Sequence, residues 1–91
     1  MELKWTSKAL SDLSRLYDFL ASENKPAAAR AVRSLAKAPS VLITNPRIGE
    51  QLFQFEPREI RWILVGQYEI RYELQEDIIY ILRLWHTRED R

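Results

Sequence analysis

The sequence predicts an α+β domain: a short N-terminal strand and a two-helix antiparallel hairpin packed on an antiparallel β meander, in the order β-α-α-β-β-β. Three patterns predict this class. Residues 2–5 alternate polar and apolar, residues 8–38 show helical spacing of Leu and Ala, and residues 58–86 form three β-rich runs with two short breaks. We expect residues 1–91 to form a single domain, because this length is near the lower limit for burying a core.

Composition excludes several classes of protein. The chain is 46% hydrophobic, which supplies one core layer, and it has no cysteine for disulfides or thiolate metal sites. The absence of cysteine fits a cytoplasmic protein. No run approaches the ~20 apolar residues of a membrane span. The net charge of +1 argues against bulk attraction to nucleic acid and leaves room for a local basic patch.

Two helices are predicted in the first half of the chain. Thr6 or Ser7 is the expected N-cap of a helix over Lys8–Ser22, and Asn24 is the expected cap of a second over Ala27–Ala38. The first helix has one apolar stripe, which consists of Leu10, Leu13, Leu16, Tyr17 and Leu20. The residues between them, Ser11, Asp12, Ser14, Arg15 and Asp18, are expected to be solvated.

Proline residues mark the interruptions that follow. Pro39 is expected to kink or end the second helix, with a short turn restarting over residues 40–43. Residues 45–49 read as a loop, residues 51–55 as an extended segment, and Pro57 as a strand edge or bulge before the meander.

The last hairpin has two possible registers. Tyr68, Ile70, Tyr72 and Leu74 alternate with polar residues, whereas residues 78–85 are apolar on both faces and should form the central strand. A two-residue turn at residues 76–77 places the following residues on the tyrosine face: Ile79, Ile81, Arg83 and Trp85. A three-residue turn with a bulge places a different set there: Tyr80, Leu82, Leu84 and His86.

Arginines recur along the meander and its tail: Arg61, Arg71, Arg83, Arg88 and Arg91. If the strand register places these arginines on one face of the sheet, they would form a patch that binds phosphate or carboxylate groups. In the alternative, they pair with Glu59, Glu69 and Glu73 and stack on Trp62 or Trp85, as in ordinary sheet decoration.

His86 is the single histidine of the chain. Its ordinary pKa suits a general acid or base, and the competing interpretation is a structural residue at a strand end. One histidine without cysteine predicts no metal site, and no motif indicates a cofactor.

Four segments together resemble the ParE/RelE toxin superfamily of bacterial toxin–antitoxin modules, over essentially the whole chain. They are Ala28-Ala29-Arg30-Ala31, Asn45-Pro46-Arg47-Ile48-Gly49, Arg58-Glu59-Ile60 and Ile81-Leu82-Arg83-Leu84-Trp85-His86-Thr87-Arg88. The Pro-Arg-Ile-Gly loop, the Arg-Glu step and the Trp-His-x-Arg ending are similar to the ParE branch, also called plasmid-stabilisation proteins.

The resemblance implies a growth-inhibiting toxin that is neutralised by a ParD-like antitoxin. ParE members inhibit DNA gyrase by binding, whereas RelE members cut mRNA in the ribosome. In the RelE alternative, nucleic acid would be a partner and His86 and Arg83 would be the catalytic candidates. Glu69 stands where RelE members often have Arg, and Thr87 where they have a C-terminal Tyr, so the gyrase interpretation is favoured. A non-toxic interaction module of the same fold is a further alternative.

The site candidates follow from these hypotheses. The candidates for target binding are Arg61, Arg71, Arg83, Trp85, His86 and Arg88. The candidates for antitoxin binding are Leu13, Tyr17 and Leu20, at the rim between the two helices. A partner peptide could dock there as a helix in a groove, or add a strand to a free sheet edge.

Overall fold

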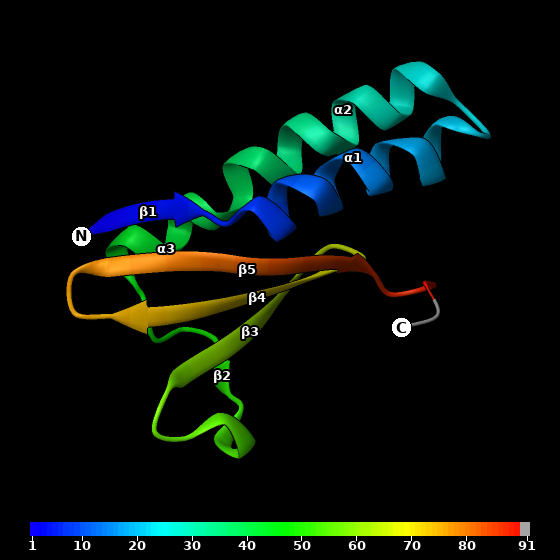
Figure 1. The fold of residues 1–91 in the computed structure, drawn as a ribbon. Helices are drawn as coiled ribbons and strands as arrows, with labels where there is room; N and C mark the ends of the chain where they lie inside the picture. The colour runs from blue at the N-terminus through cyan, green and yellow to red at the C-terminus, as the bar shows by residue number, and fades with distance from the viewer. Residues whose placement is uncertain (90–91) are drawn as a thin grey trace.

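The computed structural model describes residues 1–89 as a five-stranded sheet with the strand order β1-β5-β4-β3-β2. Helices α1 and α2 lie side by side over one face of this sheet (Figure 1). The elements are β1 (Glu2–Trp5), α1 (Ser7–Ala21), α2 (Lys25–Lys37), η1 (Ala38–Ser40), α3 (Val41–Thr44), β2 (Glu50–Gln51), η2 (Phe53–Phe55), β3 (Glu59–Val65), β4 (Tyr68–Gln75) and β5 (Ile78–His86). The predicted fold class is confirmed. Arg91 lies outside the described residues.

Both long helices begin at side-chain caps. The hydroxyl oxygen of Thr6 accepts a hydrogen bond from the amide of Ala9 at 3.1 Å, so Thr6 is the cap of α1. The same hydroxyl donates to the carbonyl of Ile81 at 2.8 Å, which ties the start of α1 to β5. Asn24 caps α2 as predicted, through a 3.0 Å bond from the amide of Ala27.

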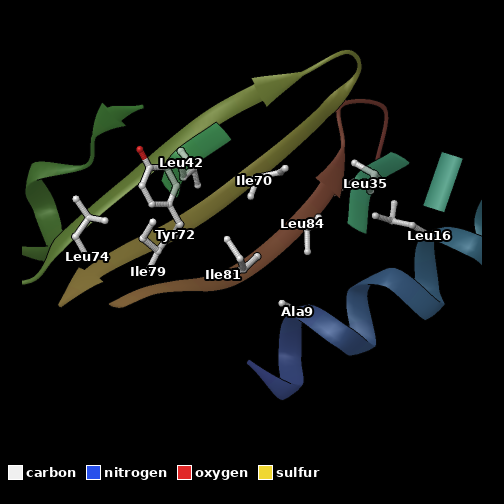
Figure 2. Packing of buried hydrophobic residues seen from close by; sticks show 10 residues of the cluster. All are labelled: Ala9, Leu16, Leu35, Leu42, Ile70, Tyr72, Leu74, Ile79, Ile81 and Leu84. Atoms are coloured by element: carbon white, nitrogen blue, oxygen red, sulfur yellow. The ribbon is translucent and has the colours of Figure 1, made fainter. Parts of the chain in front are cut away.

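The core fills the layer between the helices and the sheet (Figure 2). Strands β4 and β5 supply most of its buried side chains, and the helices add small and branched residues. The cluster consists of Ala9, Leu16, Leu35, Leu42, Ile70, Tyr72, Leu74, Ile79, Ile81 and Leu84. Burial of this apolar surface is the main favourable contribution to folding.

A β-bulge in β5 combines the two predicted registers. The two-residue turn at residues 76–77 pairs Leu74 with Ile79 and Tyr72 with Ile81. The next pair is Arg71 with Arg83, so Leu82 has no partner in β4. Because side chains alternate with a period of two, this extra residue moves every later side chain of β5 to the opposite face of the sheet. The first half of β5 therefore follows the first register, and the second half, with Leu84 and His86 buried, follows the alternative.

Two further predictions can be compared with the structure. Helix α2 ends at Lys37, and Pro39 lies in the η1 turn before α3, as expected. The extended prediction for residues 51–55 is wrong beyond Leu52, because residues 53–55 form the η2 turn. The chain must reverse between β2 and β3, and the amide of Glu56 donates a hydrogen bond to the carbonyl of Phe53 at 3.1 Å.

Within residues 1–89, no helix has both the length and the apolar character that crossing a membrane requires.

Candidate functional site

Aromatic and cationic side chains gather on the open face, which is the face of the sheet opposite α1 and α2. The guanidinium of Arg71 lies over the rings of Phe55 and Trp85, at 5.6 Å and 5.0 Å from their centroids. The guanidinium of Arg83 lies 5.0 Å from the centroid of Trp85. We call these four residues the open-face cluster. Stacking holds the two arginines beside each other although their charges repel.

Arg61 does not join this cluster. It pairs with Tyr72 across β3 and β4, so its side chain is on the helix-side face, whereas Arg71 pairs with Trp62 on the open face. The Arg61 guanidinium donates to the carbonyl of Gly49 at 2.7 Å and to Glu59 at 2.9 Å. The idea that Arg61, Arg71 and Arg83 share one face is therefore wrong, because strand alternation separates Arg61 from the other two.

His86 is buried on the helix-side face, with 2% of its surface exposed. Its ring contacts Phe19 of α1 and Tyr68 of β4, with centroid distances of 5.6 Å and 5.0 Å. Its Nδ1 atom accepts a hydrogen bond from the amide of Arg88 at 3.0 Å. Burial and, to a lesser extent, the charge of Arg88 lower the pKa of His86. This geometry is that of a packed, neutral histidine that shapes the C-terminal tail.

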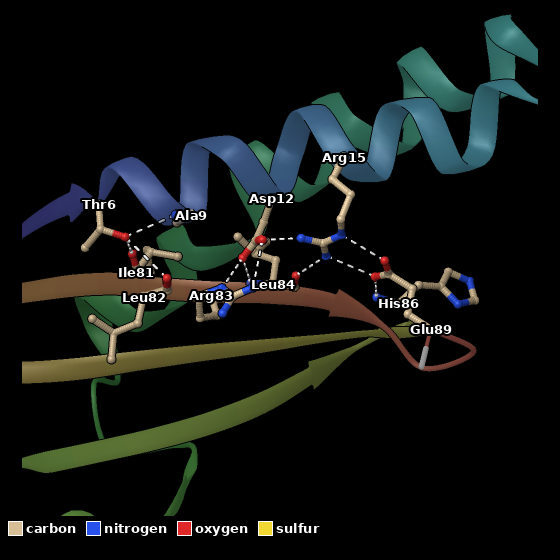
Figure 3. Close-up of polar contacts among 10 residues, drawn as sticks. All are labelled: Thr6, Ala9, Asp12, Arg15, Ile81, Leu82, Arg83, Leu84, His86 and Glu89. Carbon is tan, nitrogen blue, oxygen red and sulfur yellow. Dashed lines mark hydrogen bonds and ion pairs between the residues drawn. The ribbon is translucent and has the colours of Figure 1, made fainter. Parts of the chain in front are cut away.

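A polar network joins α1 to β5 (Figure 3). The buried carboxylate of Asp12 accepts hydrogen bonds from the Arg83 guanidinium at 2.8 Å and from the Leu84 amide at 2.9 Å, and it pairs with Arg15. Arg15 also donates to the carbonyl of Leu84 at 2.8 Å and to Glu89 at 2.8 Å. Asp12 thus accepts from the amide of Leu84, and Arg15 donates to its carbonyl. These two side chains replace the backbone partners that a neighbouring strand would supply.

This network covers an edge that β1 leaves open, since β1 pairs with β5 only as far as Ile81. Asp12 was expected to be solvated, and that expectation is wrong: its side chain is 4% exposed. Burial raises the pKa of Asp12, but hydrogen bonds from Arg83, Leu84 and Arg15 outweigh it, and the net pKa lies below its ordinary value. One feature of the sequence could have indicated this pairing: Asp12 and Arg15 are an acid and a base three positions apart, at the border of the apolar stripe.

A second buried carboxylate, Glu73, lies on the open face. Arg58 donates to it through two hydrogen bonds, at 2.7 Å and 3.0 Å. This hydrogen bonding lowers the pKa of Glu73 despite its burial. Glu59 is held in the same way by Arg47 and Arg61. Arg47, Arg58 and Arg61 therefore form ion pairs with glutamates of the sheet, as the second interpretation of the arginines predicted.

The helix candidates line a shallow hollow in part. Leu13 and Tyr17 border a hollow of about 440 Å³ between α1 and α2, together with Ser14, Asp18 and Val32. Leu20 is half-buried and does not line it. The rim between the helices thus has a depression in which an apolar side chain of a partner could be buried.

A second apolar surface lies along the outer edge of β3. Strand β2 pairs only with Arg61 and Trp62, so the rest of that edge is not covered by β2. A hollow of about 400 Å³ follows it, lined by Val41, Ile48, Gly49, Glu50, Trp62, Ile63, Leu64 and Val65. Leu64 is 57% and Ile48 is 53% exposed. A free sheet edge was predicted from the sequence, but this apolar hollow was not, because β2 is too short to be predicted from alternation.

The free energy of unfolding should decrease in two stages as the pH falls from 7 to 3. The folded pKa of His86 lies below 6.5, so the unfolded chain takes up a proton first and stability decreases below about pH 6.5. The lowered pKa values of Asp12, Glu73 and Glu89 add a second loss as the pH falls below about 4. Urea denaturation across this range measures both stages.

The matched variant for this experiment is His86→Phe. It keeps an aromatic ring between Phe19 and Tyr68 but cannot titrate, so stability should be flat between pH 7 and 5 and should still fall below about pH 4. A first stage that persists in this variant would contradict the assignment to His86.

The helix hairpin on a five-stranded sheet and the order of elements define the class: a small α+β domain of the ParE/RelE toxin superfamily. Comparisons with known proteins make this specific. Residues 3–91 match the family described as the ParE toxin of the type II toxin–antitoxin system, parDE. The chain therefore belongs to the ParE toxin family.

Two relatives show the extent of the similarity. The chain is 31% identical over 86 residues to toxin RelE2 of Caulobacter vibrioides, and the match covers 94% of each chain. The solved structure of a chromosomal ParDE toxin–antitoxin system from P. aeruginosa superposes with a TM-score of 0.79 at 26% identity, covering 94% of this chain and 95% of that chain. Each match therefore covers nearly the whole of this chain.

Proposed function

We propose that this ParE-type toxin acts in the cytoplasm by binding DNA gyrase and blocking its reaction. Membership of the ParE family is the observation that carries this proposal. The open-face cluster supports it, because tryptophan and arginine are the residues most enriched at the energetic centre of protein interfaces. The side chains of Arg71 and Arg83 remain 27% and 35% exposed, so a partner can reach them.

The environment of His86 favours inhibition by binding over catalysis by this chain. A general acid or base must reach the proton that it transfers. The His86 ring lies against Phe19 and Tyr68, and its Nδ1 atom is occupied by the Arg88 amide. The target-binding surface is accordingly proposed around Arg71, Arg83 and Trp85. It leaves out His86 and Arg61, and also Arg88, whose guanidinium lies 6.0 Å from the centroid of the Phe19 ring on α1.

An antitoxin partner completes the proposal. One structural neighbour is the ParDE system of P. aeruginosa, and we infer that a ParD-like protein neutralises this chain also. The hollow at Leu13 and Tyr17 would take one apolar anchor of an amphipathic helix. Leu20 would lie at the end of such a contact. Growth that stops on expression of this chain and resumes on co-expression of the antitoxin would support the pairing.

Purified gyrase provides the test of the target. The protein should inhibit supercoiling of plasmid DNA at micromolar concentration, and Trp85→Ala should raise the concentration needed by about tenfold, because it removes the ring between two arginines. Trp62→Ala is the matched control, since Trp62 is a tryptophan of the same face outside the cluster. We expect the control to stay within about twofold. Failure of the unmodified protein to inhibit supercoiling or trap cleaved DNA would refute the gyrase target.

The second candidate function is ribosome-dependent cleavage of mRNA. It is favoured by the 31% identity to a protein named toxin RelE2 and by the cationic open face. A cell-free translation reaction separates the two functions, because a nuclease would fragment the transcripts and a gyrase inhibitor would leave them intact. Under this alternative, Arg83→Ala should abolish the fragments.

A further inference from the structure

A hollow of about 410 Å³ opens on the open face, and three residues of the open-face cluster, Phe55, Arg71 and Arg83, line it. Its lining residues are Thr6, Ser7, Lys8, Phe55, Arg58, Ile60, Arg71, Leu82 and Arg83. Four of them are cationic, and none of these nine residues carries a carboxylate. Lys8, Ser7 and Arg58 were not among the sequence candidates. The hollow therefore combines cations that come from opposite ends of the chain.

The cations of this hollow differ in how they are held. Arg58 and Arg83 are hydrogen-bonded to Glu73 and Asp12, which fixes their positions. Arg71 is held by the rings of Phe55 and Trp85 rather than by acceptors. Its buried Nε atom has no hydrogen-bond partner within residues 1–89, and its nearest ion-pair contact, with Glu69, is 3.9 Å long. Stacking thus fixes the guanidinium and leaves hydrogen-bonding capacity for an anion.

The start of α1 forms one wall of the hollow. Ser7 and Lys8 are the first two residues of the helix, and amides at these positions have no acceptor within the helix itself. The positive end of the helix dipole adds to the charge of Lys8, for which residues 1–89 provide no ion pair. The wall therefore contributes donors of a different kind from the guanidinium groups of the sheet.

The placement of these groups on separate elements distinguishes between classes of anion. They come from the start of α1, from strands β4 and β5, and from Arg58, which precedes β3. A carboxylate presents two oxygens in one plane and is satisfied by a single guanidinium fork, whereas a phosphate presents oxygens in several directions. We propose that this hollow binds a phosphate group, from free phosphate or from a small phosphate ester such as a nucleotide.

Isothermal titration of the full chain at constant ionic strength tests the site. Inorganic phosphate, adenosine monophosphate and succinate are the probes, with succinate as the dicarboxylate control. We expect saturable binding of phosphate or of the nucleotide at one site per chain, and at least tenfold weaker binding of succinate. A nucleotide that binds tighter than phosphate identifies the ester as the source; equal binding identifies the phosphate group alone.

Two variants locate the binding and leave the buried ion pairs intact. Lys8→Gln and Arg71→Gln should each raise the dissociation constant about tenfold, the loss expected for one charge-assisted contact. Arg33→Gln, on the exposed part of α2, should leave it unchanged. Circular dichroism confirms that each variant is folded.

The proposal fails if phosphate shows no saturable binding below about 10 mM, if succinate binds equally well, or if the two variants bind like the control. A single-stranded oligonucleotide that binds far more tightly than the mononucleotide would also overturn the assignment to a small ligand. The titration contains no gyrase, so its outcome is independent of the function proposed above.

Discussion

Replacing Asp12 with alanine is expected to lower the free energy of unfolding by about 3 kcal/mol at pH 7. The substitution leaves the Leu84 amide buried without its acceptor and removes the carboxylate that faces Arg83 and Arg15. For a chain of this length the melting temperature should fall by roughly 15 °C. Urea denaturation measures the energy, and circular dichroism against temperature measures the shift.

Two further substitutions make this result specific. Asp12→Asn keeps one oxygen for the Leu84 amide but loses the charge, so its cost should be about half of that of alanine. Asp18→Ala changes an exposed carboxylate on the same helix and should cost less than about 0.5 kcal/mol. Equal effects of Asp12→Ala and Asp18→Ala would show that the network adds nothing beyond helix propensity.

Replacing Gly49 with alanine should destabilise the protein by about 3 kcal/mol, through a clash rather than through backbone strain. An added Cβ atom would lie 2.6 Å from the hydroxyl oxygen of Tyr72 and 2.7 Å from the carbonyl oxygen of Trp62. Neither atom can withdraw freely. The Tyr72 hydroxyl accepts from the Gly49 amide at 3.0 Å and donates to the carbonyl of Pro46 at 2.7 Å, and the Trp62 carbonyl belongs to β3.

The other glycine of the chain is the natural control. Gly66 has a φ of +61° in the turn between β3 and β4, and a Cβ there would meet no atom within 4 Å. Gly66→Ala should therefore cost only the backbone strain of the left-handed region, about 1 kcal/mol. A Gly49→Ala variant no less stable than Gly66→Ala would show that the loop at residues 45–49 yields to the added methyl group.

Alternation in the sequence was a good guide to β4 and a poor guide to β5. Tyr72 and Ile70 are buried as their spacing predicts. In β5, Ile81 and Leu84 point into the same core although three positions separate them, and a regular strand would place them on opposite faces. An apolar run on both faces cannot reveal where a bulge lies, because each register buries apolar residues.

The candidate site could be predicted only in part for the same reason. The cluster members Arg71, Arg83 and Trp85 were on the candidate list, and the bulge at Leu82 is what places the last two beside Arg71. Lys8 and Phe55 were missed, because contacts between residues far apart in sequence depend on where strands end and turns lie. Asp12 was missed because its partners lie about 70 positions away, at Arg83 and Leu84.

The sequence alone determined the fold class, the helix cap at Asn24, a cap at Thr6 or Ser7, the break at Pro39 and the resemblance to ParE toxins. These features depend on local spacing or on a pattern spread over the whole chain. The tertiary structure decided which side chains share a face, that His86 is buried, and that α1 completes the edge of β5. Burial and side-chain direction result from packing between distant segments, and one extra residue in a strand is enough to reverse them.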